Sequence, residues 1–393
     1  MRLRDSIEEA TFRDYVRTWL GENLTEQWRQ DYASLEGRER IDFLRKWQGQ
    51  LYEAGLAVRS WPSSYGGKDA PLTEDLIVFE ELAKHDAPPD VFRIGVRIIA
   101  PMLMKLARAD QRENYVPRIA DGRDLWSQGF SEPAFGSDLS ALTTRAVRQG
   151  DKFVINGQKV WNTYGHLADY CLLLARTNQD APPHKGLSTF VVPLSTKGID
   201  IRPLRQMNGQ QDFNEIFFDD VEIDEEALVG ELDGGWKVAM TMLDFERRGI
   251  SVLGFGCRGL YEKLIALARA TRTRDGDQYL IDLPDVRENI AWVGVQARIA
   301  VLNNHRFAAM HSDNSVPGPE TSVQKLHATE LNKTMHALAL DLIGRADLTN
   351  PQVRKSFSSW EREYLTSFGM TIAGGTSQIQ RNIISERLLG LPR

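Results

Sequence analysis

The chain has 393 residues, a formal net charge of -6 and 26% charged residues. A chain of this length is expected to divide into two or three packed sub-domains, and its acidic balance argues against a nucleic-acid binder. Two cysteines cannot make a disulfide framework, no apolar run has the length of a membrane helix, and the start does not resemble a secretory signal. We therefore expect a cytoplasmic protein that binds no membrane.

The first part of the chain, residues 1–122, has the periodicity of helices. Apolar residues recur at helical spacing along residues 7–20 and again along residues 41–54, as on one face of a helix. A third helix is expected to begin at Thr73, whose side chain can cap it and which precedes acidic residues suited to the first turn. These patterns predict an all-helical N-terminal domain.

Short β-type runs separated by turn residues follow in residues 123–233. Asn156-Gly157 lies between two of these runs, and this dipeptide is typical of a two-residue hairpin turn. Because strands and helices do not alternate here, we expect an antiparallel barrel or sandwich. The expected strands cover residues 143–148, 152–155, 158–161, 170–175, 187–194, 199–204 and 215–223.

The helical period returns in residues 234–393. One long helix is expected from Trp236 to about Ala270, and two more over residues 280–311 and 321–342, before a last helical run. Helical, β and helical blocks in this order predict an α+β fold with a middle β-domain and a C-terminal helical bundle.

A polar turn, residues 128–138, lies where the helical part becomes the β part. Ser131, Gly136 and Ser137 would let the backbone approach a ligand closely and donate hydrogen bonds, although an ordinary turn is the alternative. The sequence has no metal-ligand motif and no serine-hydrolase motif, so we expect no metal centre.

Two further motifs offer surfaces for a cofactor. In residues 157–163, Trp161 can stack on a flat ring and Thr163 can bond to a ring heteroatom, although a strand tryptophan is more often in the core. Residues 374–381 form a glycine-rich turn that opens a helix, where backbone N–H groups favour an anion such as a pyrophosphate. The alternative for this turn is an ordinary helix cap by Thr376.

In this order and spacing, the motifs resemble those of the acyl-CoA dehydrogenase family over essentially the whole chain. The patterns are Ser-Glu-Pro-x-x-Gly-Ser-Asp, Gly-x-Lys-x-Trp-x-Thr and Gly-Gly-Thr-Ser-Gln-Ile-Gln-Arg. The resemblance implies an FAD enzyme that desaturates an acyl-CoA thioester and passes electrons to an electron-transferring flavoprotein. It also implies a homodimer or homotetramer, or a heterotetramer as in an actinobacterial-type subgroup.

The resemblance also implies roles for individual residues. The flavin ring would lie beside the polar turn and the tryptophan, and the FAD nucleotide beside the C-terminal turn. The residues implied to bind FAD are Gln128, Phe130, Ser131, Gly136, Ser137, Trp161, Asn162, Thr163, Arg272, Thr376 and Gln378. Those implied to bind the substrate are Ser137, Asp244, Arg247, Gly374 and Gly375.

The reaction needs one carboxylate that removes the α-proton of the acyl group. Many relatives place a glutamate immediately before Gly-Thr-Ser. In this chain that position is Gly374, the first of the two glycines. Glu246 falls on the alternative base position of the family, on the helix that opens the last domain. The alternative is that Glu246 is not catalytic but lies on a helix face and forms an ion pair with Arg247 or Arg248. The missing side chain at Gly374 leaves space, which hints at a branched or bulky acyl group.

Two elements that cross to a neighbouring subunit in many relatives are altered here. Arg272 is kept, but the Phe-Gly-Lys that follows it in relatives is absent, and Arg274 is an alternative contact. Residues 341–345 retain only Gly344 of the pattern Gln-x-x-Gly-Gly. Three alternatives therefore stay open: an oxidase or monooxygenase of the same fold, a partner subunit without turnover, and a carrier-protein thioester as substrate.

Overall fold

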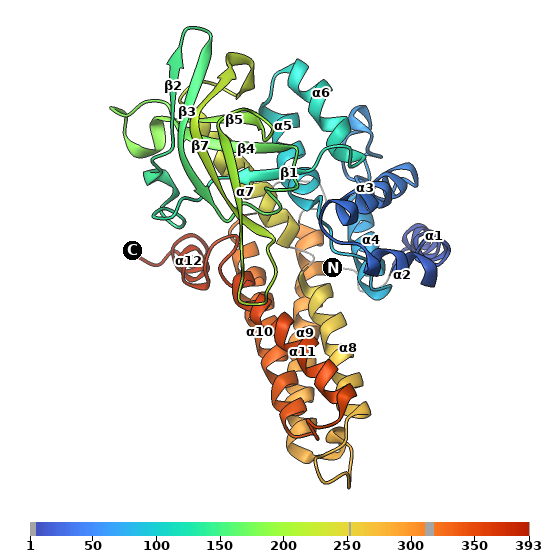
Figure 1. The fold of residues 1–393 in the computed structure, drawn as a ribbon. Helices are drawn as coiled ribbons and strands as arrows, with labels where there is room; N and C mark the ends of the chain where they lie inside the picture. Colours follow the sequence, from blue (N-terminus) through green and yellow to red (C-terminus); the bar gives the residue numbers. More distant parts are fainter. Residues whose placement is uncertain (1–4, 251–252, 311–317, 393) are drawn as a thin grey trace.

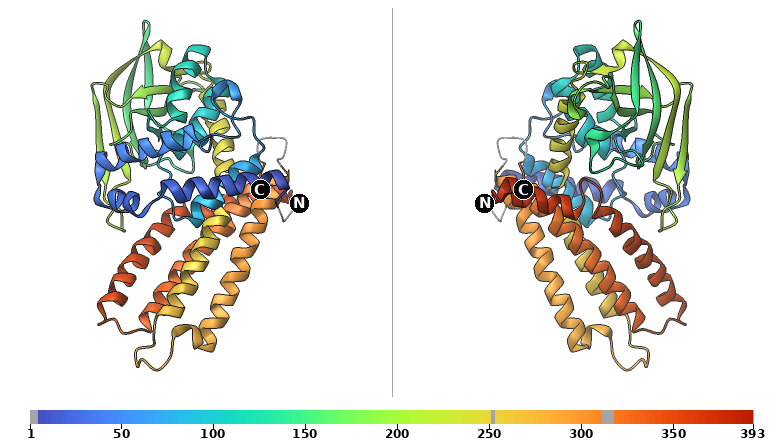
Figure 2. Two further views of the ribbon diagram at one scale, coloured as in Figure 1. Left: turned by 90° about the vertical axis from the view of Figure 1, so that its right-hand side faces the viewer. Right: turned by 90° about the vertical axis from the view of Figure 1, so that its left-hand side faces the viewer.

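The computed structural model describes residues 5–250, 253–310 and 318–392, without the side chains of residues 247–250 and 308. A mixed sheet and the N-terminal helices lie side by side, and the long C-terminal helices project from them as a bundle (Figures 1 and 2). The predicted α+β class, with helices, sheet and helices in that order, is confirmed. The domain boundaries after residues 122 and 233 stay predictions.

The N-terminal helices pack their apolar faces into one core. The side chain of Ser6 caps α1 by accepting a hydrogen bond from the amide of Glu9. The expected cap at Thr73 is wrong, because α4 begins one residue earlier, at the buried Leu72, and Pro71 precedes it without a side-chain cap. The elements are α1 Ile7–Asn23, α2 Glu26–Ser34, α3 Gly37–Glu53, α4 Leu72–Lys84, the π-helical turn η2 Gly95–Ile99, α5 Ala100–Leu106 and α6 Ala109–Ala120.

The middle of the chain forms one sheet with the strand order β6-β7-β3-β2-β4-β5-β8, and β1 pairs with β4. The sheet is mixed, because β4 runs parallel to both β1 and β2. The strands are β1 Trp126–Gly129, β2 Arg145–Gln149, β3 Lys152–Val160, β4 Tyr170–Arg176, β5 Leu187–Pro193, β6 Ile199–Leu204, β7 Phe213–Asp224 and β8 Leu228–Val229. β1 was not among the expected strands, because its residues overlap the polar turn of residues 128–138.

Asn156-Gly157 is not a hairpin turn, so that prediction is wrong. The strand β3 continues through it, with a bulge opposite β7. Gly157 has φ +148°, and a Cβ there would lie 2.6 Å from Thr144 Oγ1, so the glycine serves a close approach of two backbones. The turn between β2 and β3 lies instead at Gly150, whose φ is +66°.

The C-terminal helices form a bundle around a second apolar core that includes Leu264, Val293 and Met335. The single helix expected from Trp236 to Ala270 is divided into α7 and α8, and residues 251–252 between them lie outside the described residues. No helix in the described ranges has both the length and the apolar character needed to cross a membrane. The helices are α7 Gly235–Ile250, α8 Leu253–Ala270, α9 Pro284–Met310, α10 Thr321–Gly344, α11 Pro351–Met370 and α12 Ser377–Ile383.

A buried ion pair fixes the polar turn to the sheet. Lys159 Nζ lies 2.9 Å from Glu132 Oε1, and both side chains are buried. Burial lowers the pKa of Lys159 to about 8 against the attraction of Glu132. Burial acts to raise the pKa of Glu132, but Lys159 and hydrogen bonds from Thr143 and Thr144 outweigh it and lower this pKa to about 2. The pair is therefore ionised at neutral pH, and it ties the Ser-Glu-Pro motif to β3.

Replacing Lys159→Met should cost about 3–5 kcal/mol in the free energy of unfolding, because the Glu132 carboxylate would stay buried without its cation. The double variant Glu132→Gln/Lys159→Met should lose less, since it buries no unpaired charge. Urea denaturation followed by circular dichroism measures both. A double variant as unstable as the single one would contradict the role of the pair.

The same pair predicts a pH dependence of stability. The folded-state pKa of Glu132, about 2, lies below its ordinary value of 4.5. Its contribution to stability is therefore present above about pH 4.5 and is lost as the pH falls toward about 2. In Glu132→Gln, the difference in unfolding free energy from the native chain should shrink over that range.

Candidate active site

The polar turn and the tryptophan motif meet where β1 and β3 end. The amide of Val160 donates to the carbonyl of Ser131 over 2.9 Å. Asn162 is fully buried, and its side-chain amide donates to the carbonyl of Gln128 over 2.7 Å. Asn214 in turn donates to the carbonyl of Asn162 over 2.8 Å. Asn162 thus orients the backbone of both motifs from within, and no sequence signal assigned Asn214 to this cluster.

Trp161 is the exposed member of this cluster. Its side chain is 60% exposed, and its backbone has φ +65°, which is uncommon for a bulky residue. The indole contacts Phe213 edge to face at 6.1 Å. Thr163 follows on the same segment, and its carbonyl accepts a hydrogen bond from Ser127 Oγ over 2.9 Å. The alternative of a core tryptophan is wrong, because the backbone turns this flat side chain outward.

The other residues of the polar turn differ in how far they are exposed. Phe130 is buried, with its carbonyl accepting from Lys159 Nζ over 3.0 Å. Gly136 and Ser137 are exposed, and a Cβ at Gly136 would meet nothing within 4 Å. Among the residues that the structure describes, therefore, nothing approaches Gly136 closely enough to require a glycine.

Glu246 and Gly374 come together from α7 and from the turn before α12. Gly374 has φ +66°, and a Cβ built on it would lie 2.9 Å from Glu246 Oε1. The two base positions of the sequence analysis thus converge on one place. The Glu246 carboxylate lies beside the room at Gly374, so that room alone does not indicate the size of the acyl group, and the bulky acyl group stays a prediction. Asp244 is half-buried on the same helix, and the Arg247 side chain lies outside the described residues.

Two buried side chains donate hydrogen bonds to the carbonyl groups of the glycine turn. Gln380 Nε2 donates to the carbonyls of Gly374 and Gly375, over 2.9 and 3.2 Å. Lys325 Nζ donates to the carbonyl of Gly375 over 2.8 Å. With both carbonyls bound inward, the amide N–H groups of the two glycines have no acceptor among the residues that the structure describes. Such amides can stabilise negative charge that develops on a carbonyl oxygen.

Lys325 also brings a positive charge to this place. Its side chain is 3% exposed. Burial lowers its pKa, and the carboxylates of Glu246 and Glu330 oppose this shift by attraction. Mutual attraction of ammonium and carboxylate therefore stabilises the charge of Glu246. Sequence reasoning missed Lys325, because a lysine inside a helix carries no motif, and it missed Gln380 although this residue belongs to the quoted C-terminal pattern.

The remaining predicted FAD contacts lie at two separate places. Thr376 caps α12, with its hydroxyl accepting from the amide of Ile379 over 3.2 Å, and Gln378 is exposed beside it. Arg272 is exposed in the connection between α8 and α9, at the free end of the bundle away from the sheet (Figure 1). It donates to the carbonyl of Gly276 over 2.8 Å. Within one chain, Arg272 is thus not brought to the other residues.

Known proteins share this arrangement over the whole chain. Models of the N-terminal, middle and C-terminal domains of acyl-CoA dehydrogenases match residues 6–123, 127–221 and 233–389. The chain belongs to the acyl-CoA dehydrogenase family. The acyl-CoA dehydrogenase IpdE1 of Mycobacterium tuberculosis is 38% identical over 98% of both chains, and that of Mycolicibacterium smegmatis is 38% identical over 98% of this chain and 99% of its own.

Solved structures agree with this assignment. A steroid ACAD superposes with a TM-score of 0.86 at 28% identity over 100% of both chains. A chain of the ChsE4-ChsE5 complex from Mycobacterium tuberculosis gives a TM-score of 0.85 at 31% identity, also over 100% of both chains. Acyl-CoA dehydrogenases are in general FAD-dependent, and the residues here fit that cofactor. Trp161 offers an exposed flat face, and Phe130, Ser131 and Thr163 adjoin it through the contacts of β1 and β3.

The position of Lys325 in this acyl-CoA dehydrogenase predicts a kinetic effect. Replacing Lys325→Met removes the hydrogen bond to Gly375 and the cation beside Glu246. Bonds to charged groups contribute about 1.5–3 kcal/mol, so reduction of bound flavin by substrate should slow roughly 10- to 100-fold. Stopped-flow absorbance measures this rate.

The matched control is Lys333→Met, which removes a lysine from the same helix that pairs with Glu330 and contacts neither glycine. Flavin content of the purified protein should be equal in both variants. Equal rates for Lys325→Met and Lys333→Met would contradict the role given to Lys325.

Proposed function

We propose that this chain performs FAD-dependent α,β-dehydrogenation of an acyl-CoA thioester with Glu246 as the base. The observation that carries the proposal is the 2.9 Å between Glu246 Oε1 and the Cβ position of Gly374. The resemblance implies that many relatives place their carboxylate at the position of Gly374, so a carboxylate on α7 beside it could serve the same site. Glu246 takes the α-proton onto its carboxylate.

Hydrogen bonds from the glycine turn to the thioester carbonyl would make the α-proton more acidic. A thioester carbonyl that accepts from the amide N–H groups of Gly374 or Gly375 has its developing negative charge stabilised, and these donors are already oriented by Lys325 and Gln380. Preorganised donors cost no reorganisation during the reaction. Asp244 and Ser137 are proposed as further substrate contacts, and Arg247 remains a proposal on sequence alone.

The proposed FAD contacts form two groups. Phe130, Ser131, Trp161 and Thr163 would hold the isoalloxazine ring, and Thr376 and Gln378 would contact the nucleotide. When bound, FAD supplies the acceptor for the β-hydride. An electron-transferring flavoprotein is the proposed electron acceptor, and the cytoplasmic location remains a prediction.

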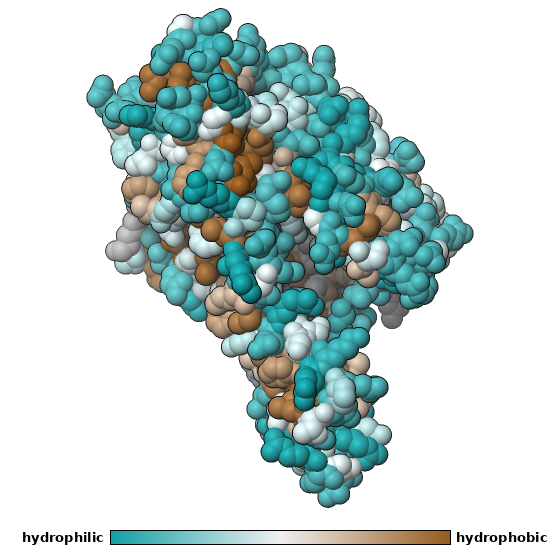
Figure 3. All heavy atoms as spheres, in the orientation of Figure 1, coloured by the Kyte–Doolittle hydropathy of each residue, from teal (hydrophilic) through white to brown (hydrophobic). Residues whose placement is uncertain are grey.

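We propose further that the chain pairs with a different dehydrogenase chain. Arg345 stands where relatives have a glycine, and it pairs with Asp285 at 2.5 Å and Asp341 at 3.0 Å. Arg272 folds back on Tyr279, with its guanidinium 4.3 Å from the ring centre. The free end of the bundle is covered mainly by hydrophilic side chains (Figure 3). These features suit a bundle end that does not complete a second FAD site.

An oligomer as such is supported by an apolar stripe on α9. Trp292, Val295 and Ile299 are exposed at helical spacing, between 39% and 58%. The ChsE4-ChsE5 relative is named as a complex, which supports two different chains over a homotetramer. The steroid ACAD relative supports a polycyclic acyl group.

Replacing Glu246→Gln should leave bound FAD in place and slow its bleaching by acyl-CoA roughly 10²- to 10⁴-fold, as for loss of a general base. Glu222→Gln, on the exposed face of β7, should match the native rate. Anaerobic absorbance after acyl-CoA addition measures both. Native bleaching by Glu246→Gln would remove the catalytic interpretation and favour a partner subunit without turnover.

The convergence of the two positions predicts a rescue. The double variant Glu246→Gly/Gly374→Glu moves the carboxylate from α7 to residue 374, from which it would reach the same location. It should recover part of the lost rate, with a penalty from the φ of +66° at residue 374. No recovery, with flavin bound and the fold intact, would contradict the shared location.

Native mass and flavin content test the assembly. Purified alone, the chain should hold less than one FAD per chain, because the second set of FAD contacts is missing. Light scattering with absorbance gives both quantities. A homotetramer with one FAD per chain would contradict the heteromer, and rapid oxygen consumption with stoichiometric peroxide would favour an oxidase.

A further inference from the structure

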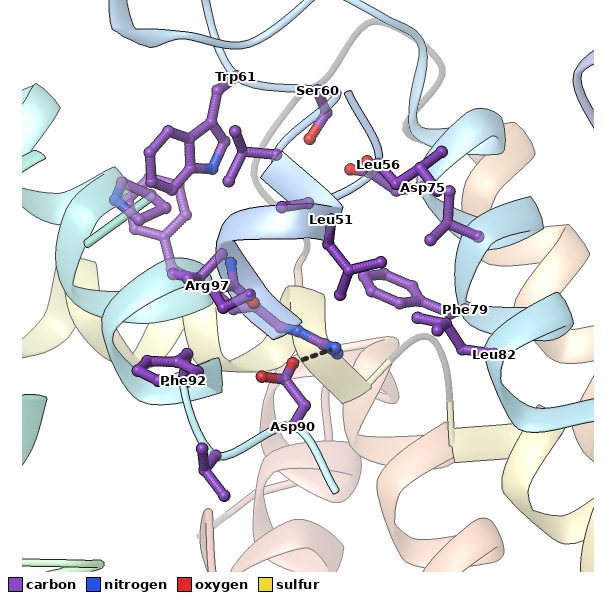
Figure 4. A pocket seen from close by; sticks show the side chains of 18 of the residues that line it. Leu51, Leu56, Ser60, Trp61, Asp75, Phe79, Leu82, Asp90, Phe92 and Arg97 are labelled. Atoms are coloured by element: carbon purple, nitrogen blue, oxygen red, sulfur yellow. Dashed lines mark hydrogen bonds and ion pairs between the residues drawn. The ribbon is translucent and has the colours of Figure 1, made fainter. Parts of the chain in front are cut away.

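Two places outside the contacts described so far hold polar side chains in partly apolar surroundings. The first is a half-open pocket among the N-terminal helices, where Ser60 and Asp75 lie near aromatic and aliphatic side chains (Figure 4). None of the described residues of the candidate active site lines this pocket. The second is the carboxylate of Glu330 on α10, which contacts the helix that follows the glycine turn. The second place therefore bears directly on the candidate site.

Glu330 connects α10 to the first residue of α12. The hydroxyl of Ser377 donates to Glu330 Oε1 over 2.6 Å, and Ser377 is 5% exposed. The amide of Ser377 donates to the carbonyl of Thr371 over 3.1 Å. Ser377 comes two residues after Gly375, so the contacts of its side chain and its backbone fix the place where the glycine turn ends.

The carboxylate of Glu330 is itself oriented by a second partner. Its other oxygen, Oε2, lies 2.7 Å from Lys333 Nζ on the same helix. Hydrogen bonds from Lys333 and Ser377 lower the pKa of Glu330 below its ordinary value of 4.5, and burial opposes this shift. The carboxylate is therefore ionised at neutral pH. Hydrogen bonds from a hydroxyl to an ionised carboxylate are shorter and stronger than those between neutral groups.

Three side chains thus hold the glycine turn, and they bind different parts of it. Lys325 and Gln380 bind carbonyl groups of the two glycines, and Glu330 binds Ser377. Lys325 and Glu330 lie on the same helix, about 7.5 Å apart along its axis. Their contacts attach the turn to α10 at two points, Gly375 and Ser377. A turn attached at two points cannot rotate about a single hydrogen bond.

We propose that Glu330 is a positioning residue for the reaction. Through Ser377 it holds the amide groups of Gly374 and Gly375 where the thioester carbonyl would accept from them. The inference rests on the proposed function, and it adds a residue that belongs to none of the sequence motifs. Fixed donors act most strongly on charge that develops during the reaction. Glu330 therefore contributes to the rate of the chemical step rather than to the affinity for acyl-CoA.

The first test separates the hydrogen bond from the charge. Glu330→Met and Ser377→Ala each remove the bond, and each should lower the limiting rate of flavin reduction by acyl-CoA roughly 10-fold. The half-saturating concentration of acyl-CoA should change less than about 2-fold. Glu330→Gln keeps an oxygen that accepts from Ser377, so it should retain at least about a third of the native rate. Anaerobic stopped-flow absorbance over a range of acyl-CoA concentrations gives both quantities.

The second test asks whether the two residues act through one bond. The double variant Glu330→Met/Ser377→Ala should be no slower than either single variant, because each of these has already lost the bond. Lys333→Met is the matched control, since it removes the other partner of the same carboxylate and leaves Ser377 in place, and it should have the native rate. Rates are taken per bound flavin, so that partial loss of FAD does not enter the comparison.

Several outcomes would overturn the proposal: multiplied effects in the double variant, a Glu330→Gln variant as slow as Glu330→Met, or a native rate in Ser377→Ala. A higher half-saturating concentration with an unchanged limiting rate would also overturn it, because Glu330 would then serve substrate binding. Failure of every acyl-CoA to bleach the flavin of the native chain would instead reject the proposed function.

Discussion

A single close approach organises the candidate active site: the carboxylate of Glu246 lies 2.9 Å from the place where a side chain at residue 374 would begin. A Cβ at residue 374 would lie 2.9 Å from Glu246 Oε1, so a side chain there would displace the carboxylate. The positive φ of Gly374 adds a second reason for glycine. Glu246, the proposed base, and Gly374 therefore belong to one site of the molecule, although they lie far apart in the sequence.

That approach depends in turn on the polar groups beneath the glycine turn. Lys325 and Gln380 bind its carbonyls, and the same lysine balances the charge of Glu246. Orientation of donors and compensation of charge thus come from one buried side chain.

The part of the candidate site around Trp161 is held by different contacts. Buried polar contacts, from the Glu132–Lys159 pair and from Asn162, fix the ends of β1 and β3. The exposed Trp161 is then presented on a backbone that its own sterics disfavour. A rigid support under an exposed indole suits a surface that receives a flat ring. At the end of the bundle, by contrast, Arg345 is held in ion pairs with residues of its own chain.

The order of helices, sheet and bundle and the family could be predicted from the sequence, because periodicity and linear motifs are local properties of a chain. The dipeptide Asn156-Gly157 was misassigned, since a bulge that accommodates Thr144 and a hairpin turn need the same small residue. The approach of Glu246 to Gly374 and the hydrogen bonds from Lys325 and Gln380 to the turn became visible in the folded chain alone. Each of these depends on distances between elements, and such distances are set by packing rather than by sequence spacing.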